Sequence, residues 1–594
     1  MPTAKRRLSL DTVEATVPAK RHRARNTSGT TTTATYPSKD YISRASDEVL
    51  VRILSYMSET CLLDVGLVSK RFQAIASDSQ LWRPHYYRRF VLPRAHRIPG
   101  FKKARSSPSL HSFPKGGASG GEASDGTLAW RKPASTKRWN AGQDQVVEWV
   151  DWKKQYRLRH NWARGRCAVE RVDVHSYKEE TAVVAPPEWQ TLIKVVEGIA
   201  ITADSVYGLR AWDLRTRQAI AQAALHFDGA RRLRASCLAV DDSRLGRGQV
   251  DVAVGFEDGT SGVWRLDAHR NTLCLLCRQE KSFLGGLLAI AYGYPYLLTA
   301  TQLGFIALYT FTTPSTDNAS DAGDDTDNEA AREACTPSPD DAEDEHVTLP
   351  APYLLTSLKS HSTQGPLALS LRKNASSVVA SIAYTFNTVG GWSIGIQDLD
   401  IRPSGAVTSR VASSSPTQTR SGRSSPSSSP LQPSTYSFGS PEDEPGPTKL
   451  RYSHPYLLAT LPDNTLVLHL CTSTTTSLII SSGIRLWGHT SGISDAEITP
   501  RGKAVSVSTR GDEIRLWELE GRPSSRSVAV WPRMLEAENG LSTDVKQDGS
   551  APQTPTKLDL DDRRRNMVGF DDEVVLVLKE ASNGRDSLML YDFT

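Results

Sequence analysis

Cys274 and Cys277, which stand three residues apart, come closest of all residues in this chain to the spacing of a metal or redox site. A structural zinc site needs four ligands, and no second Cys or His pair follows at a matching distance. The seven cysteines are scattered and odd in number, so they give no disulfide framework. No HExxH, G-x-S-x-G or Walker motif is present. We therefore predict no catalytic residue, no metal, no cofactor, and packing roles for these two cysteines in a strand.

Although no catalytic or metal-binding motif is present, four arginines could bind an anionic partner. Arg210, Arg485 and Arg515 each stand two residues before a tryptophan, and Arg510 lies in the turn before the last of these tryptophans. A guanidinium group pairs well with carboxylate and phosphate groups. These arginines are therefore candidate substrate-binding residues. The alternative is that they are ordinary solvated strand residues.

The elements that must position these arginines repeat along the chain. The clearest unit runs from Gly488 to Glu520, opens with Gly-His, and contains three runs of alternating apolar and polar residues between Ile493 and Leu519. This pattern is typical of a four-stranded propeller blade, in which the His can bond a buried Ser or Thr and the Trp. The unit resembles a WD repeat. Gly511 stands where that repeat usually has a turn Asp, and Asp512 comes one place later.

Six further segments have this signature, so we predict seven blades between residues 166 and 594. They are VYGLRAWDL, GFEDGTSGVWRLD, LGFIALYTF, WSIGIQDLD, LPDNTLVLHL and VVLVLKEASNGRDSLMLYDF. Without three insertions, at about 313–349, 402–448 and 521–565, each blade has about 43 residues, as expected for a WD-type blade. The segment from Ala168 to His175 is expected to supply the outer strand of the last blade and close the ring.

The insertions have compositions that cannot bury a core, and we predict them to be disordered. The first contains eleven Asp and Glu against one Arg between residues 321 and 345, and the second consists mostly of Ser, Thr, Pro and Gly. Ser-Pro and Thr-Pro pairs, among them Thr336 and Ser338, would suit proline-directed phosphorylation.

Residues 46–90 predict three short helices that share an apolar face. Ser46 is a good N-cap, Asp47 and Glu48 follow in the first turn, and apolar residues recur at steps of three and four. About forty residues of this kind hold a marginal core, so we expect a partner to cover the rest.

This stretch resembles an F-box, through DEVLVRILSYM, LVSKRF, I-A-S-D and LW in this order and spacing. The resemblance implies a domain at 41–92 that docks a helix face onto the Skp-type adaptor of a cullin-RING ubiquitin ligase. F-boxes usually begin with Leu-Pro, where this chain has Ala45-Ser46. The alternative is a helical subdomain packed on its own chain. The implied adaptor-binding residues are Val49, Leu50, Ile53, Leu54, Met57, Leu62, Leu63, Val68, Phe72, Leu81 and Trp82.

Basic and aromatic segments flank these helices. Residues 1–40 predict a disordered basic tail whose two Lys/Arg clusters resemble a bipartite nuclear import signal. Residues 93–143 predict a flexible basic linker, and nucleic acid is not expected as a partner because no aromatic platform accompanies the charges. Residues 144–165 predict a connecting helix with buried aromatic residues. A similar stretch in F-box proteins with WD repeats joins the helices to the propeller and fixes the distance to the substrate.

Together these features predict a multidomain protein, with a small all-α F-box of about three helices followed by an all-β seven-bladed WD-type β-propeller. The resemblance implies a non-catalytic substrate-recognition subunit of an SCF-type cullin-RING ubiquitin ligase. Its partners would be the Skp-type adaptor, through it cullin and a RING protein, and a protein substrate on the propeller. Relatives that read phosphorylated segments have an Arg where this chain has Ser494, so a phosphorylated degron is not supported.

Two other functions stay open. The chain could be a non-ligase propeller scaffold for a nuclear complex, or a nucleic-acid-associated protein that uses its basic tail and linker. No run of eighteen apolar residues occurs, so no membrane is expected as a partner. The composition and the basic tail predict a location in the nucleus and cytoplasm.

Overall fold

The structure is a computed structural model that describes residues 41–42, 44–95, 150–172, 191–225, 233–281, 284–312, 348–359, 364–374, 376–388, 391–402, 405–415, 446–519, 527–534, 566–580 and 586–594. These residues form two compact units that divide between Ala76 and Ser77, and each is described by itself. The basic tail and most of the linker and insertions lie outside the described residues, so the disorder expected there stays a prediction.

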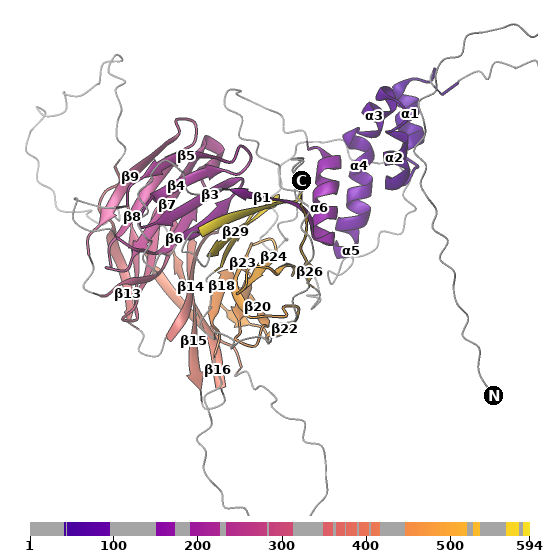
Figure 1. Ribbon diagram of the computed structural model, residues 1–594. Coiled ribbons are helices and arrows are strands. Elements are labelled where there is room, and N and C mark those ends of the chain that lie inside the picture. Colours follow the sequence, from indigo (N-terminus) through magenta and orange to yellow (C-terminus); the bar gives the residue numbers. More distant parts are fainter. Residues whose placement is uncertain are drawn as a thin grey trace, which may run out of the picture. The chain divides into compact units, whose positions relative to one another are not determined.

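The first unit contains three short helices, α1 (Asp47–Leu54), α2 (Glu59–Val65) and α3 (Lys70–Ala76) (Figure 1). Arg71 donates hydrogen bonds to the Asp47 carboxylate and to the Ala45 carbonyl, which ties the beginning of α1 to α3. Ser46 stands at the N-cap of α1, as predicted, but its hydroxyl makes no capping hydrogen bond. The buried side of the unit consists of Leu50, Leu54, Leu62, Ile75 and Ala76.

The second unit begins with α4 (Ser79–Tyr86), the π-helix η1 (Tyr87–Val91), α5 (Leu92–Ala95) and α6 (Trp152–Arg164). α4 lies against α6 (Figure 1). The Ser79 hydroxyl donates to the Val150 carbonyl at 2.7 Å and accepts from the Trp152 N–H at 3.1 Å, which joins the beginnings of the two helices. Leu81 and Trp82, at the end of the F-box-like stretch, thus belong to the same compact unit as the strands that follow.

The rest of the second unit is a seven-bladed β-propeller, which confirms the predicted fold (Figure 1). Each of the first four blades is an antiparallel sheet of four strands that follow one another along the chain. Blade 1 contains β2 (Leu192–Val196), β3 (Ile199–Asp204), β4 (Gly208–Asp213) and β5 (Gln218–Ala223). Blade 2 contains β6 (Ala235–Asp241), β7 (Gln249–Phe256), β8 (Ser261–Asp267) and β9 (Thr272–Gln279), with the short 3-10 helix η2 (Leu245–Arg247) before β7. Blade 3 contains β10 (Leu287–Gly293), β11 (Tyr296–Thr301), β12 (Phe305–Thr310) and β13 (Tyr353–Lys359).

The remaining blades follow the same plan, with additions in blades 5 and 7. Blade 4 contains β14 (Gln364–Lys373), β15 (Val378–Thr388), β16 (Gly391–Ile401) and β17 (Val407–Ser413). Blade 5 contains β18 (Lys449–Ser453), β19 (Tyr456–Thr460) and β20 (Leu466–Ser473), and both β21 (Leu478–Ile480) and β22 (Ile484–Leu486) pair with β20. Blade 6 contains β23 (Ile493–Ile498), β24 (Lys503–Ser508), β25 (Ile514–Glu518) and β26 (Val528–Ala529). Blade 7 contains β28 (Met567–Phe570), β29 (Val574–Glu580), β30 (Asp586–Asp592), β1 (Arg166–Val172) and β27 (Trp531–Met534).

The ring closes because the first strand of the propeller completes the last blade. β1 pairs antiparallel with β30, with Val169 opposite Tyr591, which confirms the predicted closing role of the segment from Ala168. β27 then pairs in parallel with β1 as a fifth strand, an addition that was not predicted. Pro532 in β27 suits this place, because a strand at the edge of a sheet needs fewer backbone donors.

Two insertions are shorter than predicted. β17 lies inside the range 402–448, and β26 and β27 lie inside the range 521–565. The outermost strand of a blade is half exposed, so its sequence is polar, as in Val-Thr-Ser-Arg-Val-Ala-Ser of β17. Such a strand resembles the Ser- and Thr-rich segment beside it, which is why these boundaries were wrong.

Hydrogen bonds join the Gly-His opening of blade 6 to its strands. Trp517 Nε1 donates to Ser506 Oγ at 2.8 Å, and His489 Nε2 lies 2.6 Å from the same hydroxyl. The predicted connection from the histidine through a buried serine to the tryptophan is therefore present. Glu513 Oε2 lies 3.5 Å from His489 Nδ1, so Glu513, and not Asp512, stands beside the histidine.

The pH dependence of stability tests this buried histidine. Burial lowers the pKa of His489 to about 4, from an ordinary value of 6.5. The unfolded chain therefore takes up the proton first, so this stability is complete above the ordinary pKa and is lost as the pH falls toward the lowered one. We expect His489→Gln to remove up to about 3 kcal/mol of the acid-induced loss, measured by urea unfolding from about pH 7.5 to 4.5. His269→Gln, at an exposed histidine, is the control, and an equal change in both variants would contradict the prediction.

Candidate functional site

Six large apolar side chains on α1, on α2 and in the turns that follow them are exposed. Val49, Ile53 and Tyr56 follow one another at steps of four and three residues, which places them on one face of α1 and the turn after it. Leu63, Leu67 and Val68, on α2 and just after it, are also exposed, to 87% at Leu67. We call these six residues the apolar patch. So much exposed apolar surface on so small a unit is typical of a protein-binding site.

The structure divides the predicted adaptor-binding residues into an exposed and a buried set. The apolar residues of α1 were predicted to share one face of the helix. In the structure Val49 and Ile53 are exposed, whereas Leu50 and Leu54, the residues directly after them, are buried. Tyr56 and Leu67 were missing from the predicted set, although Tyr56 stands three residues after Ile53. The exposed residues are Val49, Ile53, Leu63 and Val68, the half-buried ones are Met57 and Phe72, and the buried ones are Leu50, Leu54, Leu62, Leu81 and Trp82.

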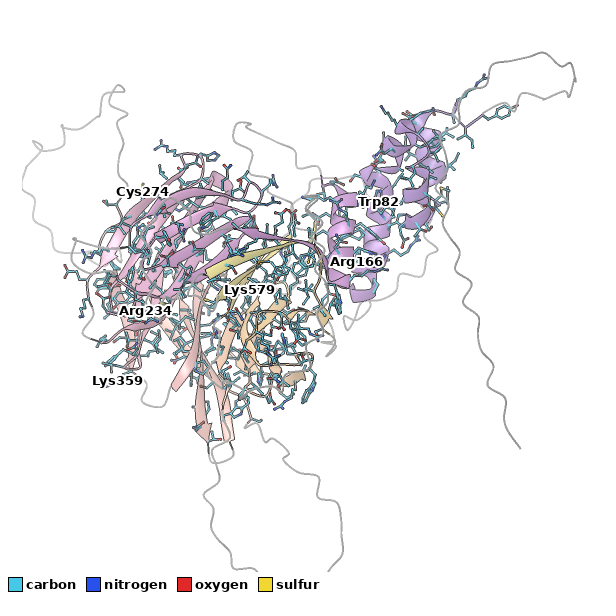
Figure 2. The ribbon with its side chains drawn as sticks, viewed as in Figure 1. Trp82, Arg166, Arg234, Cys274, Lys359 and Lys579 are labelled. Carbon is cyan, nitrogen blue, oxygen red and sulfur yellow. The ribbon has the colours of Figure 1, made fainter. Side chains whose placement is uncertain are left out.

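An aromatic cluster joins α4 to α6. The ring of Trp82, which Figure 2 labels, lies 5.3 Å from the ring of Tyr156. The rings of Tyr86 and Trp152 are also 5.3 Å apart. Phe90 of η1 adds a contact with Tyr156 at 5.4 Å. Buried aromatic packing was predicted for this region, and the described part of it has such packing. These ring contacts hold α4 and η1 against α6.

Trp162, near the end of α6, anchors this helix to the last blade. Its ring stacks on Phe593 with centroids 4.5 Å apart, and its Nε1 donates to the Asp572 carbonyl at 2.8 Å. Gly165 ends the helix with φ +65°, and a Cβ there would lie 2.0 Å from the Ala529 carbonyl oxygen. A larger residue at this position would therefore push α6 away from blade 6.

Ion pairs surround the anchor. Lys154 of α6 lies 3.0 Å from Glu573, and Lys503 of blade 6 lies 2.8 Å from Asp572. Burial lowers the pKa of Lys503 to about 8, while Asp572 acts in the opposite direction. The ammonium group of Lys503 also lies 4.8 Å from the centre of the Trp162 ring. Charged and aromatic contacts thus hold α6 at the same place.

These contacts place α6 on one face of the propeller. Because neighbouring strands of a blade are antiparallel, its successive turns alternate between the two faces. α6 contacts the end of β30, the β28–β29 turn and the beginning of β24, which all lie at one face. We call it the helix face, and the opposite one, with the β24–β25 turn, the distal face.

The four candidate arginines have different environments. Arg210 is buried and pairs within blade 1 with a carboxylate at 3.0 Å. Arg485 and Arg515 pair with carboxylates of blades 5 and 6, at 2.7 and 2.6 Å. The tryptophan that follows Arg485, Trp487, stands beyond the outer strand β22 and is exposed, so Arg485 does not share the position of the other two. Arg510 is exposed in the β24–β25 turn on the distal face.

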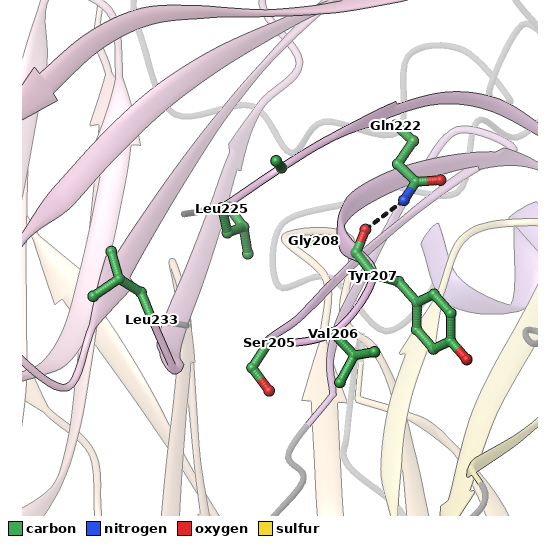
Figure 3. A pocket seen from close by; sticks show the side chains of 8 residues that line it. Ser205, Val206, Tyr207, Gly208, Gln222, Leu225 and Leu233 are labelled. Carbon is green, nitrogen blue, oxygen red and sulfur yellow. Dashed lines mark hydrogen bonds between the residues drawn. The ribbon is translucent and has the colours of Figure 1, made fainter. Parts of the chain in front are cut away.

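A small pocket opens beside the β3–β4 turn of blade 1 (Figure 3). Its volume is about 120 Å³, below the range of most sites for small molecules. Gln222 Nε2 donates across it to the Tyr207 carbonyl at 2.7 Å. The lining contains no charged side chain: Ser205, Val206, Tyr207, Gly208, Gln222, Ala224, Leu225 and Leu233.

Cys274 and Cys277 lie on β9, the outer strand of blade 2. Cys274 is exposed, whereas Cys277 is half-buried, so the predicted packing role fits Cys277 alone (Figure 2). Among the residues that the structure describes, no three His, Cys, Asp or Glu side chains are grouped to hold a metal. No helix in the described ranges is both long and apolar enough to cross a membrane.

Two family models match this chain. One is described as F-box-like and matches residues 47–88, which include α1 to α4. The other is described as F-box protein pof12 beta-propeller and matches residues 176–594. This chain belongs to the F-box protein pof12 beta-propeller family. F-box domains generally bind Skp-type adaptors and propellers bind proteins, so this architecture is typical of non-catalytic substrate-receptor proteins.

Similarity to solved structures is weaker. The crystal structure of RRP9 WD40 repeats is 10% identical, with a TM-score of 0.38 over 72% of this chain and 97% of that one. The β-propeller domain of Myceliophteria thermophila Cps50 (Swd1) is 11% identical, with a TM-score of 0.36 over 68% of this chain and 100% of that one. A search of curated proteins finds no match.

The anchor of α6 can be tested by truncating its tryptophan. Trp162→Leu removes the stacking on Phe593 and the hydrogen bond to Asp572, so we expect a loss of about 2–4 kcal/mol in the free energy of unfolding. Guanidinium unfolding of the full chain measures this loss. Trp531→Leu, at a tryptophan that is 71% exposed, is the matched control and should change stability by about 0.5 kcal/mol or less. Similar losses in both variants would show that Trp162 is no anchor.

Proposed function

We propose that this chain is the substrate-recognition subunit of an SCF-type cullin-RING ubiquitin ligase. The observation that supports this most directly is the apolar patch in the unit that the F-box-like model matches. Burying such side chains is worth about 1.5–3 kcal/mol each, which a groove on a Skp-type adaptor would supply. Cullin and a RING protein would then join through the adaptor.

The propeller would hold the protein substrate on its distal face. α6 and its ion pairs occupy part of the helix face, whereas the β24–β25 turn with Arg510 is exposed on the distal one. A substrate held there would be presented to a ubiquitin carrier at high effective concentration, so the chain itself needs no catalytic group. We further propose that the chain acts in the nucleus and cytoplasm, on the basis of the two basic clusters before residue 26.

Adaptor binding tests the proposal directly. Val49→Asp together with Ile53→Asp places charge on the apolar patch and leaves buried Leu50 and Leu54 in place. We expect the affinity of the full chain for a purified Skp-type adaptor to fall by about 100-fold or more, because two central apolar contacts are worth about 2 kcal/mol each. Titration calorimetry measures the affinity. Val411→Asp, at a valine that is also exposed but lies on blade 4, is the control and should bind normally.

Two outcomes would count against this function. A folded double variant that binds the adaptor as tightly as the original chain would show that the patch has another role. If the folded original chain does not bind the adaptor at all, the propeller would be a scaffold outside a ligase.

A further inference from the structure

Positive charge is concentrated in the region that joins the two predicted domains. Residues 83–166 contain 19 Lys and Arg against 5 Asp and Glu, a net charge of +14, whereas the whole chain has a net charge of +5. The rest of the chain is therefore negative overall. Such a separation of charge favours contacts between the two parts, because opposite charges attract over about 10 Å at ordinary salt concentrations.

α6 presents part of this charge to solvent. Lys153, Arg157 and Arg164 stand at steps of four and seven residues, so they share one face of the helix, which we call the basic face. Lys154 and Arg159 lie outside this face and pair with carboxylates of blades 7 and 6. Arg157 and Arg164 are exposed and form no ion pair with any residue in the described ranges. Lys153 is partly buried, and its Nζ donates to Ser77 Oγ at 2.8 Å. The basic face is therefore open to an anionic segment at Arg157 and Arg164.

The acidic insertion of blade 3 emerges from the same face of the propeller as α6. It follows the end of β12 and precedes the beginning of β13, which both lie at the face of the β10–β11 turn. The inner strands β10, β14, β18, β23 and β28 neighbour one another around the ring. The β10–β11 turn therefore corresponds to the β28–β29 turn, which α6 contacts through the Asp572 carbonyl. Both segments belong to the helix face.

The insertion is long enough to reach α6. The middle of the acidic run lies about 15 residues before Thr348, the next residue that the structure describes, and this length of chain spans up to about 50 Å. Four strands about 4.8 Å apart make a blade about 15–20 Å deep. This length of chain therefore suffices to connect blade 3 with blades 6 and 7 on the helix face.

We propose that the acidic segment 321–345 of this chain docks on the basic face of α6. Its eleven acidic residues and one Arg give it a net charge of −10, which complements Lys153, Arg157, Arg164 and the basic residues near them. Because the two parts are tethered, the effective concentration is in the millimolar range, so weak ionic contacts suffice. Phosphorylation of Thr336 or Ser338 would add negative charge inside the segment and strengthen the contact.

Chemical cross-linking of variants that preserve the positive charge tests this contact. Arg157→Lys and Arg164→Lys in the full chain keep the positive charge and add primary amines that a carbodiimide can join to carboxylates. We expect mass spectrometry to find cross-links from these two positions to residues 321–345 at about 50 mM salt, and at least a five-fold loss of them at about 1 M salt. Arg510→Lys, on the distal face, is the matched control. Cross-links to the acidic segment that are equally frequent from the control position would overturn the proposal.

A binding experiment with a peptide of the acidic segment distinguishes this segment from other anionic partners of the basic face. In a second variant, every Asp and Glu of 321–345 is replaced by Asn or Gln, which frees the basic face. We expect a labelled peptide of residues 317–347 to bind this variant at least ten-fold more tightly than the original chain, and Arg157→Glu with Arg164→Glu to abolish that gain. Circular dichroism confirms folding. If the neutralised variant binds a 20-base-pair DNA duplex but not the peptide, the basic face is a nucleic-acid site and the proposal fails.

Discussion

The stacking of Trp162 on Phe593 is the contact on which the attachment of α4 and α6 to the propeller depends. Phe593 is the residue before the last in the chain, and Trp162 stands three residues before the glycine that ends α6. The aromatic cluster of α4 and α6 builds on this helix, so its position relative to the blades follows from the same contact. An aromatic pair of this kind contributes about 0.5–1.5 kcal/mol beyond the area that it buries, and here it also aligns the donor of Trp162 with a backbone carbonyl.

The attachment of α6 and the closure of the ring depend on the same segment of the chain. Gly165 connects α6 directly to β1, and β1 is the strand that completes blade 7 by pairing with β30. The carbonyl of Gly165 also accepts a hydrogen bond from the Trp531 N–H at 2.7 Å, at the beginning of β27. Local opening of β1 would therefore open the ring and release the helix together, so α6 is as stable as the closure itself.

The sequence predicts the architecture well because both domains have strong periodic patterns. The strands of blade 6 appear at almost the same residues in the structure, and the closing role of the segment from Ala168 follows from an incomplete last blade. Outer strands such as β17 escaped prediction because half-exposed strands have polar sequences. The apolar face of α1 was predicted as one surface, although Leu50 faces inward and Val49 outward, since steps of three and four residues do not say which side a core will cover.

The binding arginines show why position along a repeat is a weak guide to a site. Arg210 and Arg515 share one place in their blades, yet Arg210 is buried while Arg515 keeps partial exposure. The rings of Tyr207 and Trp212, from its own blade, lie against the Arg210 guanidinium group. Arg485 precedes a tryptophan that stands beyond an additional outer strand, so the same dipeptide spacing arises there in another structural context. In a propeller, recognition comes from turns and from charges brought to one face by topology. The exposed Arg510 and the unpaired cations of α6 in the described part of the chain therefore carry more functional information than the repeat signatures themselves.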